Sequence, residues 1–351
     1  MKKWMLLSLV VLMALTAVVA ACGPAAAPEP TEPPAPECAA NVGMVSDVGG
    51  VDDASFNQNT WEGLVMAEED LGVCSQFIES QAQADYERNI TEFAEQGYEL
   101  IITVGFLLGD ATAKMAAEYP DTNFAIVDYA YDPGIPNVQG IVFATDGAAF
   151  PTGYLAAAWA VMQDPDDPQI GYVAGMQVPT VEIFVEAYTA GAEYYNEQKG
   201  TNVLVKGTYV GDFEAPDEGK TQGLSLIDEG VDIIFGIGGK TGNGGITAAK
   251  ERGKWGIGVD VDQYYTLPNE KDILITSCMK RLDNSVFGTV EALLNDEFAG
   301  GGVYVGTLEN GGVGLAPFHD FEDDIPAELV AELDDITQGI MDGTIDTGWE
   351  G

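Results

Sequence analysis

Residues 47–64 read Asp47-Val-Gly-Gly-Val-Asp-Asp-Ala-Ser-Phe-Asn-Gln-Asn-Thr-Trp-Glu-Gly-Leu64, and this is the most informative stretch of the chain. It follows the apolar run 42–45 and leads into a helical pattern with Trp61, Leu64 and Leu71 on one face. A strand, a polar loop with glycines and then a helix form the place where an open α/β sheet binds its ligand. The loop's carboxylates, amide, hydroxyl and single aromatic ring suit a small ligand with a flat face and several hydroxyls or amides. We therefore predict a ligand site here rather than a simple turn.

Apolar runs typical of strands alternate with helix-length segments along almost the whole chain. Short, continuous β-branched runs fit strands that are buried on both faces, and the intervening segments can cross over a parallel sheet. Ten such units are too many for one compact sheet, so we expect an α/β protein with two lobes. The predicted strands cover residues 42–45, 76–78, 100–104, 124–127, 138–143, 170–174, 203–210, 233–237, 256–259 and 273–276.

The first passage between the lobes is expected after Phe143, where residues 149–161 read as a helix. The polar, proline-broken loop Asp164-Pro-Asp-Asp-Pro168 then restarts the strand pattern. After residue 300 the pattern is less regular, with a strand-like run at 303–307 and an amphipathic stretch at 327–341.

The N-terminal residues carry a targeting signal rather than part of the fold. Two lysines precede the apolar run 5–19, which is too short for a stable membrane span. The run ends in Val19-Ala-Ala-Cys22, which resembles the bacterial lipobox and implies cleavage before Cys22 and lipid attachment to it; an ordinary signal peptide is the alternative. We expect a signal peptide at 1–21, a Pro/Ala/Glu-rich tether at 22–37, and a protein lipid-anchored to the cell membrane at its extracytoplasmic face.

The charge of the mature chain limits its partners. Lys2 and Lys3 leave with the signal peptide, so 57 acidic and 12 basic residues remain. This balance argues against binding to nucleic acid or to an anionic membrane surface, both of which need basic patches. It also disfavours a polyanionic ligand such as a nucleoside triphosphate.

Two cysteines are placed for a disulfide. Cys38 lies just before the first predicted strand and Cys74 just before the second. The starts of neighbouring parallel strands lie side by side, so a Cys38–Cys74 disulfide is reasonable in an exported protein, with two free thiols as the alternative. Cys278 is expected to be a small buried core residue.

The sequence offers little for catalysis. The single histidine, His319, stands beside Asp320 in a polar tail segment and is expected to be a surface residue. Without it no Ser–His or Cys–His pair can form, and Cys-x-x-Cys and zinc-type spacings are absent from the sequence. Residues 319–324 could ligate a cation weakly, but we interpret them as a solvated acidic loop. We expect no enzyme activity, no cofactor and no metal site.

A glycine-rich segment, residues 235–245, follows one predicted strand and opens a helix. It departs from the Walker pattern at Ile234 and from the dinucleotide fingerprint at Thr241. Its backbone N–H groups can nevertheless face a ligand.

Polar groups stand at three further strand ends. Asp128, Asp260 and Lys280 each follow an apolar run, as Asp47 does. The carboxyl ends of parallel strands are where α/β sheets bind ligands, so this shared placement is the argument for a site. Phe184 begins the helix after the sixth predicted strand and, taken alone, would be assigned to the core.

At this point several motifs resemble one family closely. Gly43-Met-Val-Ser-Asp47, Asp53-Ala-Ser-Phe-Asn57 and Trp61-Glu-Gly63 look like the signature of the basic membrane lipoprotein family. The likeness covers nearly all of the chain from residue 42 to about 346 and continues through residues 97–106, 137–143, 257–263 and 276–281.

The family consists of substrate-binding proteins of ATP-binding-cassette importers with a periplasmic-binding-protein type I fold. The resemblance implies a monomer with two doubly wound parallel-sheet lobes, joined by several crossings, that clamp a ligand between them and meet the importer's permease subunits. We expect residues 38–150 and about 276–300 in the first lobe, and residues 151–275 and about 301–351 in the second.

The resemblance also implies a nucleoside site. In members that bind purine nucleosides two aromatic rings sandwich the base, and Phe56 and Phe184 match those positions. Asp47 and Asn57 match residues near the base or ribose, and Asp128 matches a strand-end polar contact.

The ribose has its own matching residues. Asp260 and Lys280 match groups that hold the ribose hydroxyls, since a carboxylate accepts from two vicinal hydroxyls while an ammonium donates to one. Gly238 and Gly239 would let the backbone approach the sugar. The implied ligand-binding set is Asp47, Phe56, Asn57, Phe106, Asp128, Phe184, Gly238, Gly239, Asp260 and Lys280.

We therefore expect a lipid-anchored protein that captures a nucleoside, with a purine favoured, for an importer. A membrane-anchored sensory receptor with the same pocket is the first alternative. A nucleoside hydrolase is the second, and the absence of a placed histidine or metal motif weighs against it.

Overall fold

The computed structural model describes residues 38–350. The predicted signal peptide, the lipid-attachment residue Cys22 and the tether lie outside the described residues. Within residues 38–350 no helix is long and apolar enough to cross a membrane.

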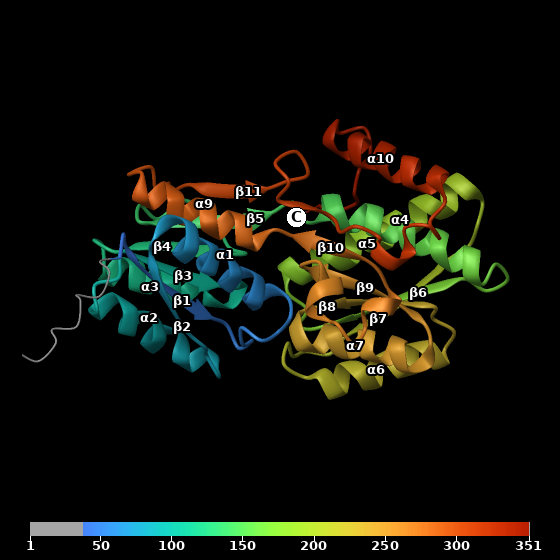
Figure 1. Cartoon of the computed structure of the whole chain (residues 1–351), viewed down its shortest axis with the longest axis horizontal. Helices are drawn as coiled ribbons and strands as arrows, with labels where there is room; N and C mark the ends of the chain where they lie inside the picture. Colours follow the sequence, from blue (N-terminus) through green and yellow to red (C-terminus); the bar gives the residue numbers. More distant parts are fainter. Residues whose placement is uncertain (1–37, 351) are drawn as a thin grey trace, which may run out of the picture. The chain divides into compact units, whose positions relative to one another are not determined.

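The first sheet is entirely parallel (Figure 1). Strand β3 shows why the strands of this sheet are continuous apolar runs. Its neighbouring residues Ile101 and Ile102 pack into cores on opposite faces of the sheet. Its six strands among the described residues, in spatial order, are β11 (Val303–Gly306), β5 (Val138–Phe143), β4 (Asn123–Val127), β3 (Leu100–Val104), β1 (Asn41–Ser46) and β2 (Cys74–Ile78).

The second sheet repeats this order with later strands and is parallel except at β12, which runs antiparallel to β10. In both sheets most strands are followed by a loop and then a helix. The six strands of the second sheet within residues 38–350, in spatial order, are β12 (Val313–Leu315), β10 (Leu274–Lys280), β9 (Trp255–Asp260), β8 (Ile233–Ile237), β6 (Gln169–Ala174) and β7 (Leu204–Tyr209).

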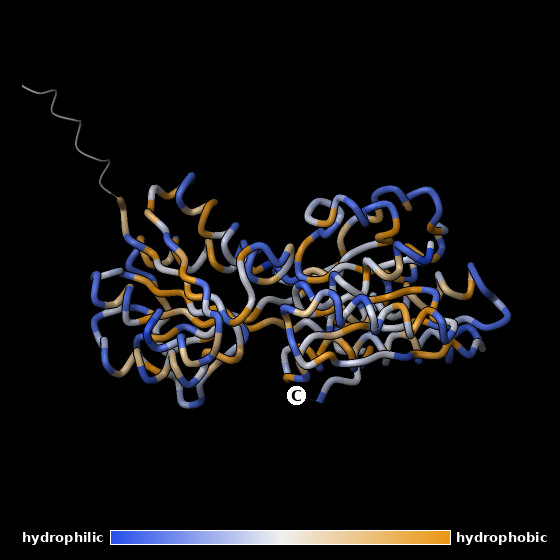
Figure 2. The backbone as a smooth tube through the Cα atoms, turned by 90° about the horizontal axis from the view of Figure 1, so that it is seen from below, coloured by the Kyte–Doolittle hydropathy of each residue, from blue (hydrophilic) through white to orange (hydrophobic). Residues whose placement is uncertain are grey.

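Helices cover both faces of each sheet. On the first sheet α1 packs with α9 on one face and α2 with α3 on the other; on the second, α4 packs with α5 and α6 with α7. In Figure 2 the apolar stretches run through the inside of each sheet and the hydrophilic stretches lie on loops and outer helices. The helices are α1 (Phe56–Leu71), α2 (Tyr86–Glu95), α3 (Gly109–Glu118), α4 (Asp146–Gln163), α5 (Pro179–Lys199), α6 (Pro216–Asp228), α7 (Gly239–Arg252), α8 (Gln263–Thr266), α9 (Leu282–Leu294) and α10 (Ala327–Met341), with 3-10 turns η1 (Gln83–Asp85), η2 (Phe106–Leu108), η3 (Lys271–Ile273) and η4 (His319–Phe321).

The two sheets and their helices form the doubly wound α/β lobes of a periplasmic-binding-protein type I fold. The chain passes between the sheets after β5, after β10 and after β11. The observed strand pairing departs from the expected lobe boundaries at two places. β10 pairs with β9 in the second sheet, although residues from about 276 were expected in the first lobe, and β11 pairs with β5 in the first sheet, although residues after 300 were expected in the second.

The physical reason is that both runs are short and apolar, and such a run fits either sheet until its neighbours are known. We propose lobes divided at the observed crossings: residues 38–143 with 281–306, and residues 144–280 with 307–350.

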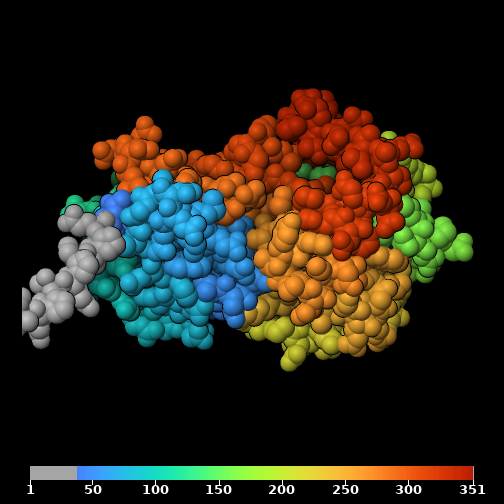
Figure 3. Space-filling model, viewed as in Figure 1, coloured from blue at the N-terminus to red at the C-terminus, as the bar shows by residue number. Residues whose placement is uncertain are grey.

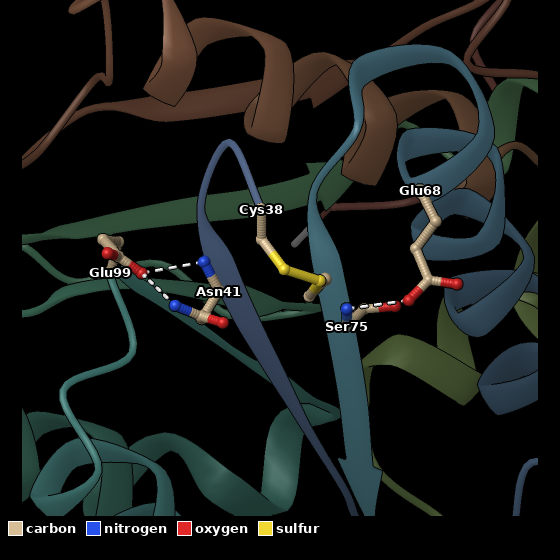
Figure 4. The surroundings of a disulfide bond; sticks show 6 residues. Cys38, Asn41, Glu68, Ser75 and Glu99 are labelled. Atoms are coloured by element: carbon tan, nitrogen blue, oxygen red, sulfur yellow. Dashed lines mark hydrogen bonds between the residues drawn. A yellow bond between two sulfur atoms is a disulfide. The ribbon is translucent and has the colours of Figure 1, made fainter. Parts of the chain in front are cut away.

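Cys38 and Cys74 form a disulfide at the starts of β1 and β2, with Cα atoms 5.5 Å apart (Figure 4). The strands are in register there, because Asn41 lies opposite Cys74. Glu99 accepts hydrogen bonds from the backbone N and Nδ2 of Asn41, which fixes the start of β1 further. Cys278 is a free, buried thiol, as expected.

Candidate functional site

A cavity lies between the carboxyl ends of the two sheets, and all ten residues of the expected ligand-binding set line it. Eleven further lining residues were not in that set: Gly49, Asp53, Gly105, Leu107, Val178, Thr180, Val181, Phe213, Glu214, Ile237 and Val259.

Asp128 and Asp260 lie at the carboxyl ends of β4 and β9 in a strained backbone conformation. Their φ angles are +64° and +65°, in the left-handed region that side-chain-bearing residues rarely occupy. Such conformations persist only where the surrounding structure holds them, and they are concentrated at binding sites. Both carboxyls are more than nine-tenths buried and belong to different lobes.

Lys280 ends β10 and is 2 % exposed. Its Nζ lies 2.7 Å from Asp128 Oδ2 and within 4.9–5.6 Å of the ring centroids of Phe56, Phe143 and Phe184. Burial raises the pKa of Asp128, and the nearby ammonium of Lys280 opposes that rise. The lysine is therefore held both by an ion pair and by aromatic faces.

The Asp260 carboxyl has a different partner. Ser55 Oγ, from the first lobe, donates to Asp260 Oδ2 at 2.5 Å, and no described residue donates to the other carboxylate oxygen. Burial raises the pKa of Asp260 to about 6, while Lys280 and the Ser55 hydroxyl lower it. At neutral pH the carboxylate is ionised and keeps one oxygen for a ligand.

Asp47 and Asn57 form a polar pair in the cavity wall. Asp47 Oδ1 accepts from Gly49 N at 2.9 Å and from Asn57 Nδ2 at 3.3 Å. Burial raises the pKa of Asp47 to about 7. Asn57 Oδ1 is buried and has no hydrogen-bond partner among residues 38–350, an arrangement that is costly unless a ligand donates to it.

Phe56 and Phe184 approach the cavity from different lobes, at the starts of α1 and α5. Phe184 is 2 % exposed and packs edge-on against Phe235, so it is both a core residue and a wall of the cavity. Phe106, also of the expected set, stands on η2 with its ring 5.4 Å from that of Tyr129.

Glycines of the glycine-rich segment, residues 235–245, line the cavity and also allow close packing of neighbouring elements. Gly238, with φ +88°, and Gly239 line the cavity. A Cβ atom at Gly242 would collide with Ile237 N, and one at Gly244 with Pro216 O, so these two glycines allow α7 to approach β8 and α6.

Asp53 anchors the loop that enters α1 and was not expected at the site. Its carboxylate accepts from the backbone N–H groups of Ser55, Asn57 and Gln58. It is a helix N-terminal acceptor that fixes the backbone beside Phe56.

Phe213 and Glu214 were missed because they follow β7 by several residues and show no strand-end pattern. Glu214 Oε2 lies 3.0 Å from Lys240 Nζ, while its Oε1 is buried without a partner among the described residues. A Cβ atom at Gly175 would collide with the Phe213 ring, so the lack of a side chain at Gly175 makes room for the ring.

The expectation that His319 is a surface residue was wrong. Its side chain is 14 % exposed, its Nε2 lies 2.7 Å from Asp262 Oδ2, and its ring stacks on Tyr264 at 4.0 Å. The two partners lie more than fifty residues earlier in the chain, so local sequence could not reveal them. No cluster of three or more His, Cys, Asp or Glu residues suited to a metal occurs in the described part of the chain.

Comparison with known proteins shows the family of the chain. The profile of the Bmp family, described as "ABC transporter substrate-binding protein PnrA-like", matches residues 40–348. The chain belongs to the Bmp family. Bmp proteins are substrate-binding proteins of ABC transporters and are not enzymes.

Two relatives and one solved structure illustrate the Bmp family. The chain is 31 % identical over 320 residues to the "ABC transporter nucleoside-binding protein BmpA" of Lactococcus lactis, covering 86 % of this chain and 87 % of that protein. It is 31 % identical over 280 residues to an "uncharacterized lipoprotein" of Pyrococcus furiosus, covering 78 % and 69 %. An ABC transporter solute-binding protein from Aeropyrum pernix superposes with a TM-score of 0.82 at 29 % identity, over 88 % of this chain and 92 % of that one.

Proposed function

We propose that this solute-binding protein captures a nucleoside, with a purine base, between its two lobes and delivers it to an ABC importer. The observation that carries the proposal is the pairing of two aromatic rings from opposite lobes, Phe56 and Phe184, with the charged groups of Asp260 and Lys280 in one cavity. The name of the Lactococcus lactis relative supports a nucleoside ligand.

The two aromatic rings suit a base. A ring stacked on each face of a base contributes about 1–3 kcal/mol, and stacking is tolerant of base identity. The unpaired oxygen of Asn57 accepts from a ring N–H or an amino group. The Asp47 carboxyl, with a pKa of about 7, offers an acceptor when ionised and a donor when protonated.

The charged groups of the cavity suit a ribose. The free oxygen of Asp260 accepts from hydroxyls, and the Lys280 ammonium donates to one. Gly238 and Gly239 carry no side chains that would keep a sugar from the backbone.

The charges in the wall favour a neutral ligand. Asp47, Asp53, Asp128 and Asp260 are buried there, and Lys280 is already paired with one of them. A phosphate group would meet net repulsion in a poorly hydrated site. Nucleosides are therefore expected to bind far better than their phosphates.

Membrane attachment through a lipid on Cys22 is part of the proposal. It is supported by the lipobox-like sequence and by the lipoprotein name of the Pyrococcus furiosus relative. In cell fractionation the Cys22→Ser variant should move from the membrane to the soluble fraction; retention at the membrane would contradict the anchor.

Calorimetric titration of the purified protein tests the ligand. Inosine, guanosine, adenosine, uridine, ribose, hypoxanthine and inosine monophosphate are compared under the same conditions. Purine nucleosides should bind at least a hundredfold more tightly than ribose or free base, because ribose lacks the part that stacks on the rings and a free base lacks the hydroxyls. Binding of a sugar alone or an amino acid, with no nucleoside bound, would overturn the proposal.

A matched pair of variants tests the aromatic wall. Phe56→Ala should weaken nucleoside binding by ten- to a hundredfold through the lost ring face. Phe77→Ala, on the edge strand β2 and outside the cavity, removes a ring that is 39 % exposed and should leave affinity unchanged.

A further inference from the structure

Three consecutive residues before α1, Asp53 to Ser55, carry hydrogen bonds to the second lobe; we call them the latch segment. Figure 3 shows the blue surface of the early chain against the orange surface of the second lobe. Asn243 Nδ2 donates to Asp53 O at 2.8 Å. Gln263 Nε2 and Thr266 Oγ1 donate to Ala54 O at 3.0 and 2.9 Å.

The latch segment is held in a backbone conformation that these bonds explain. Ala54 has a φ of +56°, which is unfavourable for a residue with a Cβ atom. The two donors on its carbonyl oxygen come from α8, in the second lobe. Since Phe56 and Asn57 follow directly, the closed arrangement of the lobes also places two cavity residues.

Ser55 is the member of the latch segment whose side chain bonds to a cavity residue of the second lobe. It is fully buried, and its Oγ donates to Asp260 Oδ2 across the boundary between the lobes. Ser55 and Asp260 belong to different lobes, so this bond exists only when the lobes meet.

We propose that Ser55 is a positioning residue that couples closure of the lobes to Asp260, holding one carboxylate oxygen so that the other faces the bound ligand. The role of Asp260 as a ligand contact rests on the proposed function. The contact between Ser55 and Asp260 does not.

The charged and titratable groups around Asp260 determine how loss of the Ser55 hydroxyl changes the pKa of Asp260. Lys280 favours the ionised carboxylate, whereas Asp128 and Asp53 disfavour it, and the buried Cys278 thiol stays protonated at neutral pH. The Ser55 hydroxyl also lowers the pKa of Asp260. Its removal therefore favours the protonated carboxyl, which is a poorer acceptor for ligand hydroxyls.

The first experiment measures inosine affinity between pH 5 and 8.5 for the wild type, Ser55→Ala and Ser55→Thr. In the wild type affinity should fall as the pH drops through about 6. In Ser55→Ala the midpoint should rise by at least half a pH unit, so the affinity loss relative to the wild type should be about twofold or more at pH 6 and smaller at pH 8.5. Ser55→Thr keeps the hydroxyl and should retain the wild-type midpoint.

Ser80→Ala is the matched control, because Ser80 is also buried in the first lobe but accepts only from Asn89 of the same lobe. Its affinity profile should keep the wild-type midpoint. Equal loss at every pH in Ser55→Ala, or no loss, would overturn the positioning role.

A second experiment needs no ligand. Carboxyl carbon NMR of aspartate-labelled protein, with Asp260 assigned through Asp260→Asn, follows its titration in the wild type and in Ser55→Ala. An upward shift for Asp260 with none for Asp47 supports the positioning role even if no nucleoside binds. An unchanged titration of Asp260 would overturn it even if nucleosides bind as proposed.

Discussion

Asp128 and Asp260 occupy equivalent places in the two lobes but have different partners. Each follows the third strand in the order of its sheet, each has a φ near +65°, and each is buried. Asp128 pairs with the Lys280 ammonium at 2.7 Å, whereas the Asp260 carboxylate accepts, from residues 38–350, only the hydrogen bond of the Ser55 hydroxyl at 2.5 Å.

The difference separates two tasks for the same residue type in the same backbone setting. Because Asp128 is paired with an ammonium, its main effect is to hold Lys280 in place. Asp260 has a neutral partner, so it keeps an ionised oxygen for hydroxyl donors and remains sensitive to pH. Equivalent topology places the carboxylates, and their neighbours decide what they do.

Replacement of Lys280 should have the largest effect on stability and on nucleoside binding. In Lys280→Met both aspartates lose the positive charge near them, and a buried carboxylate without its partner costs about 3–5 kcal/mol. Urea unfolding should show a loss of that size, and calorimetry should detect no nucleoside binding.

The exposed pair Lys220–Glu251 provides the control for that variant. Lys220→Met should change stability by less than about 1 kcal/mol and leave affinity unchanged, because exposed ion pairs contribute little. Similar effects for the two lysine variants would contradict a special role for the buried pair.

Asparagine substitutions compare the two aspartates directly, since asparagine tolerates the same left-handed backbone. Asp260→Asn should weaken nucleoside binding by about a hundredfold, because an ion–hydroxyl contact of about 1.5–3 kcal/mol is lost. Asp128→Asn should cost about tenfold, through a less fixed Lys280. The reverse order in calorimetric titrations would show that Asp128 is the ligand contact.

Stability and binding should respond to pH in opposite directions. Burial raises the pKa of Asp260 to about 6 and that of Asp47 to about 7, from an ordinary value of 3.8. Between pH 4 and 7 the native protein then binds more protons than the unfolded chain, so these groups stabilise it as the pH falls. Nucleoside binding falls over the same change, because protonated Asp260 is a poorer acceptor.

The Asp260 contribution is the difference between wild type and Asp260→Asn, since asparagine does not titrate. Urea unfolding at pH 5 and 7.5 should show that the wild type gains about 1–3 kcal/mol relative to the variant at the lower pH. A difference that is constant with pH would show that Asp260 has an ordinary pKa.

The smallest effect on binding is expected from the disulfide, which ties β1 to β2 in the first lobe. In the second lobe the matching position pairs Gln169 with Leu204 and has no such tie. Changing Cys38 and Cys74 to serine should lower the unfolding free energy by about 4 kcal/mol, because the bond spans 36 residues of sequence. Affinity should change less than twofold, since the cavity lies at the opposite ends of the strands; a larger loss would show that the lobe edge governs the site.

The strand ends of the site were predictable because parallel strands bring their carboxyl ends together. Asp47, Asp128, Asp260 and Lys280 each follow an apolar run, and all four line the cavity. The helix α10 was also predicted with the bounds that the structure has, because its apolar residues repeat with helical spacing.

Contacts between distant segments were not predictable from one sequence. The bond between Ser55 and Asp260 joins residues 205 positions apart, and Glu214 enters the cavity from a loop without a strand-end pattern. The sheet to which β10 or β11 belongs depends on pairing energy with neighbours that the run itself does not encode.

Lys280 is the last residue of β10, and the chain changes lobe immediately after it. Its carbonyl oxygen accepts from Asn59 Nδ2 of α1, so its backbone is attached to the first lobe while its strand belongs to the second. A ligand that binds the Lys280 ammonium therefore also restrains the segment at which the chain crosses between the lobes. Lys280 thereby joins the wall of the cavity and the connection between the lobes in one residue.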